Sequence, residues 1–183
     1  MPRPRYSKRP LPPYAHIPGQ TPHPVSDPRG HMHGAVHKAP PPLDPDNWQA
    51  SEAYLLGVDL FNHGFYWEAH EAWESLWIAA GRSGPVAIWL KALIKLAAAM
   101  VKIRAGNAVG GARHALRAQE LLGDLFGMID PADPACFIRS YCGMPRLSVG
   151  TVAQEVFGIA DRSPQRFDST AVLKHALELD YPS

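Results

Sequence analysis

The sequence predicts an all-α protein, a compact bundle of about four core helices in two antiparallel hairpins. Apolar residues recur at the spacing of a helical face through most of residues 47–127. Short breaks that contain glycine separate these segments, as expected where one helix ends and the next begins. The flanking segments differ in composition. They predict a proline-rich extended strap, residues 1–46, and a C-terminal extension, residues 128–183, with short helices that pack on the core.

The strap holds thirteen of the nineteen prolines and five of the nine histidines. Proline removes a backbone donor and keeps the preceding residue extended, so this segment cannot be helical. Its composition would permit a disordered basic tail. The apolar residues Tyr14, Ile17 and Val25, together with turn signals such as Pro18-Gly19, favour a strap that wraps around the bundle.

The first hairpin is predicted from two helices, residues 48–63 and 65–80. Gly64 separates them, and a turn this short forces the second helix back against the first. Within the first helix, Gly57 can admit a close aromatic neighbour such as a tryptophan. Asp59 is expected to face solvent.

The second hairpin is predicted from residues 85–105 and 108–126, with Gly106-Asn107 between them. Lys91, Lys95 and Lys102 lie on the arc opposite the apolar face, which indicates a solvated surface. Without interleaved exposed aromatic residues this is a weak signal for nucleic acid. The C-terminal extension is predicted to form short helices over residues 135–142, 149–157 and 170–179, which could cover the bundle or mediate a homodimer.

Composition narrows the class of protein. The net charge of +1 gives no global field that would favour nucleic acid or a membrane surface. Cys136 and Cys142 lack the spacing of a redox or zinc motif, so free thiols are expected. No apolar run reaches the about 18 residues of a spanning helix, and no secretory signal is visible. These features predict a cytoplasmic protein without a membrane partner.

The candidate site lies in residues 61–77, FNHGFYWEAHEAWESLW, a segment dense in aromatic residues with two histidines and three glutamates. On a helix, one arc carries four of its side chains: Tyr66, His70, Trp73 and Trp77. Trp67 and Glu74 flank that arc, Glu71 lies at its edge, and Glu68 falls on the opposite side. So wide an aromatic face must be buried, and it is expected to carry His70 and Glu74 into the interior.

Two interpretations of His70 and Glu74 remain open. They can satisfy each other and merely fix how helices pack, or they can form a metal-ligand set or an acid–base pair. In the second case His70, Glu74 and Glu71 are the candidate catalytic residues, and hydrolysis is the least specific reaction class. The candidate substrate-binding walls are aromatic: Tyr66, Trp67, Trp73 and Trp77.

A divalent metal is the candidate cofactor, with His70 and Glu74 as ligands. If the strap passes over this helix, His23 or His31 would complete a three-ligand set. Glu74 stands where a zincin motif H-E-x-x-H has its second histidine, which disfavours that class.

Three stretches together resemble a known family: FNHGFYWEAHEAWESLW, WLKALIKLAAAMVKIRAGN and GARHALRAQELL. The sequence over residues 48–126 is similar to the small all-α family called domain of unknown function 309. Members usually carry glutamines in the third helix where this chain has Lys91 and Lys95, and some have a leader resembling the strap. The resemblance implies a compact helical bundle and supplies no activity.

Two classes of function follow from the sequence. The first is a domain that binds a small molecule or a metal at the His–Glu pair, with a hydrolase-like reaction as its candidate activity. The second is a non-enzymatic interaction module that binds a protein partner through the lysine face or the C-terminal extension, with the His–Glu pair as core architecture. Nucleic-acid binding is a distant third.

Overall fold

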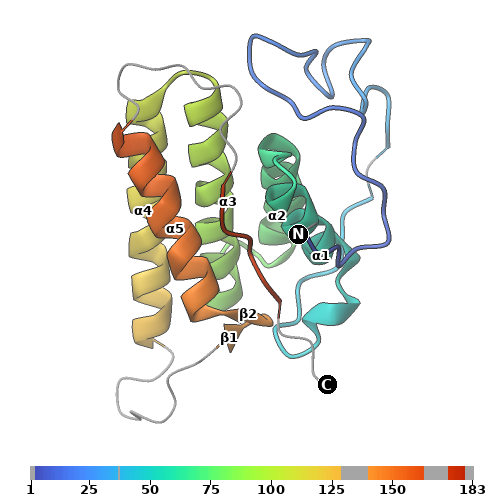
Figure 1. The fold of residues 1–183 in the computed structure, drawn as a ribbon. Coiled ribbons are helices and arrows are strands. Elements are labelled where there is room, and N and C mark those ends of the chain that lie inside the picture. The colour runs from blue at the N-terminus through green and yellow to red at the C-terminus, as the bar shows by residue number, and fades with distance from the viewer. Residues whose placement is uncertain (1–2, 37, 129–139, 163–172, 180–183) are drawn as a thin grey trace.

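A computed structural model describes residues 3–36, 38–128, 140–162 and 173–179 (Figure 1). Within these ranges the chain forms five α-helices, one 3-10 helix and a two-stranded hairpin. Their bounds are η1 Trp48–Ala50, α1 Glu52–Asn62, α2 Tyr66–Ala79, α3 Gly84–Arg104, α4 Ala108–Met128, β1 Ser140–Tyr141, β2 Met144–Pro145 and α5 Arg146–Arg162.

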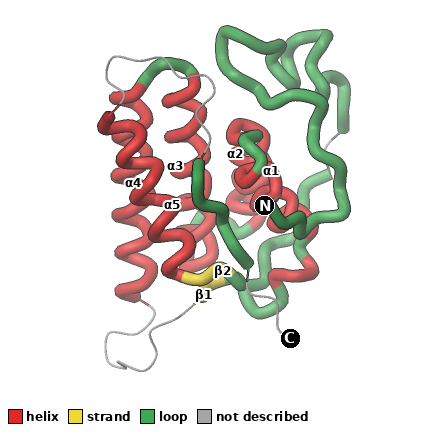
Figure 2. Tube along the Cα trace, in the orientation of Figure 1, coloured by secondary structure: helices red, strands yellow, loops and turns green. Residues whose placement is uncertain are grey.

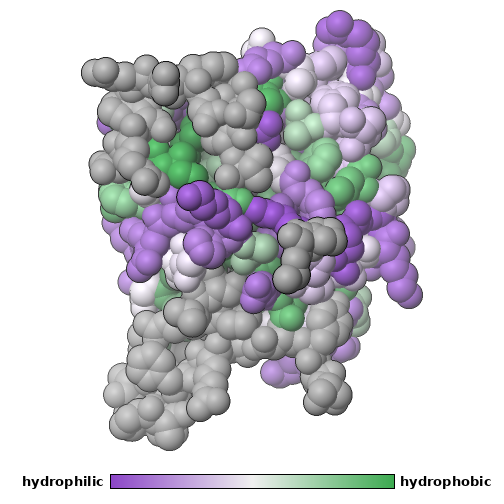
Figure 3. Space-filling model, viewed as in Figure 1, coloured by the Kyte–Doolittle hydropathy of each residue, from purple (hydrophilic) through white to green (hydrophobic). Residues whose placement is uncertain are grey.

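The predicted all-α bundle is confirmed. Helix α1 packs on α2, α2 on α3, and α3 on α4, while α5 lies against α4 and α3. The strap runs beside α1 and α2 as a loop (Figure 2). On the face shown in Figure 3, the visible hydrophobic residues form scattered areas between hydrophilic ones. None of the helices in the described ranges is both long and apolar enough to cross a bilayer.

The first helix begins later than predicted. Residues 48–50 form the 3-10 helix η1, and α1 starts after Ser51. The Ser51 side chain accepts a hydrogen bond from the Tyr54 backbone N–H at 3.4 Å and so caps the first turn. Trp48 stays buried although it lies outside α1.

The predicted C-terminal helices are only partly correct. Helix α5 contains the predicted segment 149–157 and extends beyond it. The prediction for 135–142 is wrong at its described end, where Ser140–Tyr141 forms β1 and the buried free thiol of Cys142 follows in the turn. Residues 135–139, including Cys136, lie outside the described residues.

The prediction of a helix over residues 170–179 is also wrong where it can be compared, because residues 173–179 are not helical. The Asn62 side chain pairs with the backbone of Leu177 instead: Nδ2 donates to the carbonyl and Oδ1 accepts from the N–H, both at 2.8 Å. This buried amide supplies the hydrogen bonds that a helix would have made internally. Residues 170–172 lie outside the described residues.

Aromatic side chains fill the centre of the bundle, among them Tyr54, Phe61, Tyr66, Trp73 and Trp89. The expectation that Gly57 admits a tryptophan is confirmed. A Cβ atom at Gly57 would lie 2.2 Å from Trp73 Nε1. The indole of α2 therefore reaches the backbone of α1 only because residue 57 has no side chain.

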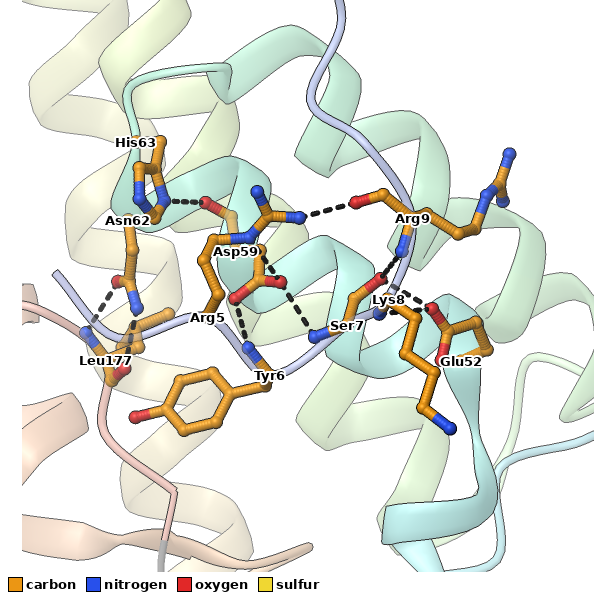
Figure 4. A network of polar contacts seen from close by, with 10 residues as sticks. All are labelled: Arg5, Tyr6, Ser7, Lys8, Arg9, Glu52, Asp59, Asn62, His63 and Leu177. Carbon is orange, nitrogen blue, oxygen red and sulfur yellow. Dashed lines mark hydrogen bonds and ion pairs between the residues drawn. The ribbon is translucent and has the colours of Figure 1, made fainter.

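The strap is anchored to α1 through Asp59 (Figure 4). The expectation that Asp59 faces solvent is wrong, because it is fully buried. Its carboxylate accepts hydrogen bonds from the backbone N–H groups of Tyr6 and Ser7, both at 2.8 Å, and from Arg5 Nε at 2.9 Å. The helical pattern of α1 alone cannot predict this burial, because the donors come from residues more than fifty positions away in the sequence.

Two further side chains of α1 continue this anchorage. Glu52 accepts from Ser7 Oγ at 2.6 Å and from the Lys8 N–H at 2.9 Å. The Arg3 guanidinium donates to the carbonyl oxygens of Asn62 and Leu173. The start of the strap and the C-terminal segment 173–179 therefore meet at the end of α1.

We expect Asp59→Asn to destabilise the protein by about 3 kcal/mol, because the amide turns a donor toward strap N–H groups and leaves Arg5 without its counter-charge. Urea denaturation followed by circular dichroism measures this. Asp124→Asn on the exposed surface of α4 is the matched control, expected within about 0.5 kcal/mol of wild type. Equal effects of the two substitutions would contradict the anchoring role.

We expect Gly57→Ala to destabilise the fold by about 1–3 kcal/mol, although alanine is the better helix former, because its methyl group would overlap the Trp73 indole. Gly123→Ala in α4 is the control, since a Cβ there meets nothing within 4 Å. It should stabilise by up to about 1 kcal/mol. Thermal denaturation of both variants should shift in opposite directions.

Candidate functional site

All the candidate site residues between positions 66 and 77 lie on helix α2. Its buried face consists of Tyr66, Ala69, Trp73 and Leu76, a spacing of three and four residues that turns one stripe toward α1 and α3. The remaining faces are half-buried or covered by the strap. The site residues therefore differ in environment according to their position around this one helix.

His70 and Glu74 lie at the rim of the buried stripe and not in the core. Their side chains are 27% and 42% exposed, and His70 Nε2 lies 3.8 Å from Glu74 Oε2. The expectation that both groups are carried into the interior is therefore wrong. The separation is also too long for a hydrogen bond, so the two groups do not satisfy each other directly.

Glu71 joins this pair. One ligand atom from each of His70, Glu71 and Glu74 can be chosen so that all three lie within 4.8 Å of one another, and each residue is half-buried. Together they offer an imidazole nitrogen and two carboxylate oxygens. Glu74 lies four positions after His70 and three after Glu71, and at these two spacings side chains on adjacent turns of a helix are neighbours.

Burial lowers the pKa of His70, and the nearby positive charge of Lys95 lowers it further, while Glu74 opposes the shift. Burial also raises the pKa of Glu71, and the negative charge of Glu74 adds to that effect. At neutral pH the imidazole is therefore uncharged and has a free lone pair. A cation placed among the three groups would relieve the repulsion between the two carboxylates.

The four aromatic residues expected as walls divide into two pairs. Tyr66 and Trp73 are buried in the core, where the Tyr66 hydroxyl accepts from the Leu173 N–H at 3.4 Å. Trp67 and Trp77 are half-buried. The Trp77 ring has two cationic neighbours, Arg82 and Lys91, each 5.4 Å from its centroid.

The strap does cross α2, but on another side from the one expected. The ring of His23 packs edge-on against Trp67 with 5.2 Å between centroids, and His31 Nε2 lies 3.7 Å from Glu68 Oε1. Neither histidine belongs to the group formed by His70, Glu71 and Glu74. The structure therefore does not bring His23 or His31 together with His70 and Glu74.

Glu68 is buried, although helical periodicity predicts the opposite. It was expected opposite the buried face, yet it is only 4% exposed because the strap covers it. Its Oε1 accepts from the His16 backbone N–H at 2.9 Å. Burial raises the pKa of Glu68 to about 7, against the opposing effects of backbone N–H groups and Arg104. No signal within α2 itself could have found it, because the cover comes from another part of the chain.

The histidines around Glu68 form an aromatic layer. His16 packs edge-on against both His23 and Trp67, with centroid distances of 5.1 and 5.4 Å. Burial lowers the pKa of His16, and the neighbouring His23 lowers it further. Burial likewise lowers the pKa of His31. These rings are therefore mostly neutral at physiological pH.

Residues 54–114 match the family model described as domain of unknown function 309 (DUF309). The resemblance seen in the sequence is confirmed. The matching segment begins within α1, covers α2 and α3, and ends within α4, so it includes both Glu68 and the His70, Glu71 and Glu74 group. No curated protein and no solved structure matches the chain.

We expect the stability gained by Glu68→Gln to grow with pH. The folded pKa of about 7 exceeds the ordinary value of 4.5, so the protonated form favours folding and this contribution is lost as the pH rises through 7. Glutamine does not titrate. The free energy of unfolding of the variant minus that of wild type should therefore increase by up to about 3 kcal/mol between pH 4.5 and 8.

Urea denaturation at several pH values, with EDTA present, measures this difference. Glu120→Gln on the exposed face of α4 is the control, and its difference from wild type should stay nearly constant. A pH-independent difference for Glu68→Gln would contradict the burial of an ionisable carboxyl group at this position.

Proposed function

We propose that this protein is a metal-binding domain in which α2 binds a divalent transition-metal ion through His70, Glu71 and Glu74. The observation that carries this proposal is the convergence of three potential ligand atoms within 4.8 Å of one another on one half-buried helix surface. The two carboxylates and one neutral imidazole form a ligand set of ordinary composition for zinc and its neighbours in the first transition row.

The distances support an ion of this size. Two ligands bound tetrahedrally at about 2.0–2.1 Å from zinc lie about 3.4 Å apart. His70 Nε2 and Glu74 Oε2 are 3.8 Å apart, so a small rotation of either side chain would bring both to bonding distance. A direct hydrogen bond would require a closer approach.

Three protein ligands would leave a coordination position open, as in catalytic zinc sites. A metal ion held in this way polarises a bound water molecule, which is the chemistry that hydrolases use. On this basis hydrolysis of a small-molecule substrate is the reaction class we propose for the site. Trp67 and Trp77, the half-buried aromatic residues of α2, would bind its apolar part.

We expect His70→Asn, Glu71→Gln and Glu74→Gln each to weaken zinc binding by at least about tenfold, because each removes a charge or a lone pair from the ligand set. Isothermal titration calorimetry of the full chain with Zn²⁺ measures the affinity. Circular dichroism checks that each variant is folded. Since these side chains are partly exposed, their replacement should leave the fold intact.

Glu120→Gln is the matched control, because Glu120 is an exposed helical carboxylate that pairs with Arg117. Its zinc affinity should equal that of wild type. If the three substitutions in α2 have no more effect than this control, the ion does not bind at His70, Glu71 and Glu74, and the proposed function is wrong.

A further inference from the structure

We infer that Glu68 of α2 and His31 of the strap bind a second divalent metal ion, of the zinc class, in the interface between the strap and α2. This site shares no residue with the group at His70, and the inference does not rest on the function proposed for that group. Its effect would be to fasten the strap to the bundle.

The first argument is that these side chains are buried without being satisfied. The Glu68 and His31 side chains are 3% and 8% exposed. Within the described ranges, three of their polar atoms have no hydrogen-bond partner: Glu68 Oε2, His31 Nδ1 and His31 Nε2. Buried polar atoms are nearly always paired, so three unpaired atoms on two adjacent side chains favour a ligand between them.

The second argument is the distance between the two side chains. His31 Nε2 lies 3.7 Å from Glu68 Oε1, which is too far for a hydrogen bond. It is close to the about 3.4 Å that separates two ligands of one tetrahedral zinc ion. Oε1 accepts the His16 N–H at 2.9 Å with one lone pair and keeps a second lone pair for an ion shared with His31, while Oε2 is unpaired.

The third argument comes from two other histidines of the strap, His16 and His23, which already have partners. His16 Nδ1 lies 3.1 Å from Thr21 Oγ1, and His23 Nδ1 accepts from the N–H groups of Val25 and Ser26 at 3.2 Å. These contacts hold the two rings in place beside Trp67. His31 therefore differs from its neighbours in having an imidazole that is buried and has both nitrogens unpaired among the described residues.

The geometry assigns one ligand to the strap and one to α2. The backbone around His31 is positioned by the strap itself, since its N–H donates to the Tyr14 hydroxyl at 3.4 Å and its ring packs edge-on on Tyr14 at 4.6 Å. Glu68 is fixed by α2. An ion between them would therefore link two parts of the chain that are far apart in sequence.

The test is the number of zinc ions bound after dialysis of the full chain against Zn²⁺, measured by elemental analysis. Wild type should bind about one ion more than Glu68→Gln or His31→Phe, since each variant loses one of the two protein ligands. Glutamine keeps the acceptor for the His16 N–H, and phenylalanine keeps the packing on Tyr14, so both variants should remain folded. Loss of the ion in both supports the inference.

Two controls match these variants. Glu52→Gln changes another carboxylate that anchors the strap, and His33→Phe changes an exposed histidine two residues from His31. Both should bind as many ions as wild type. If Glu68→Gln and His31→Phe also bind the wild-type number, the inference is overturned. Loss of the ion in His70→Asn concerns the proposed function alone, so the two failures are distinguishable.

Tryptic cleavage after Arg29 provides a second readout, because this exposed residue lies two positions before His31. With free Zn²⁺ at about ten times its dissociation constant, the fraction of molecules with an open strap should fall about tenfold, and cleavage should slow accordingly. The effect should occur in wild type and in Glu52→Gln but not in Glu68→Gln. Equal slowing in all three would contradict a metal-linked strap.

Discussion

The arrangement of this protein depends on a carboxylate, Asp59, that α1 buries completely and that the N-terminal strap satisfies. Two backbone N–H groups and the Arg5 guanidinium converge on it within 2.9 Å. A buried charge without such partners would cost several kcal/mol, so the burial of Asp59 on α1 depends on the strap. Asn62, one turn further along α1, holds the C-terminal segment by pairing its buried amide with the backbone of Leu177. One short helix thereby holds both extensions of the bundle in place.

The strap meets a second carboxylate where it crosses α2, and there the outcome differs. Glu68 is as well covered as Asp59, but it receives one strap N–H group at Oε1 and leaves Oε2 unpaired. The same covering segment therefore satisfies one buried acid and leaves the other incomplete. This contrast makes the interface at Glu68 and His31 a candidate site for a metal ion. The interface at Asp59, in which the carboxylate has all its partners, is structural.

Helix α2 offers two different chemical environments on its two sides. His70, Glu71 and Glu74 lie at a half-exposed rim, where an ion could exchange with solvent. Glu68 lies under the strap, and Trp67 directly precedes it in the chain and packs its half-buried ring against His16 and His23. The segment that matches DUF309 contains the ligands proposed on α2, but it begins after the strap. His31 is therefore contributed by a part of the chain outside the family match.

The sequence by itself determined the fold class, the two hairpins, the helix ends near Gly64 and Gly106, and the room for an aromatic neighbour at Gly57. These features depend on local spacing and on backbone geometry, which neighbouring residues specify. Tertiary structure decided which acids are buried. Asp59 and Glu68 both lie on the outward side of their own helices, and the N-terminal strap covers them. Helical periodicity describes one element at a time, so it could place His70 near Glu74 but could not bring His31 to Glu68.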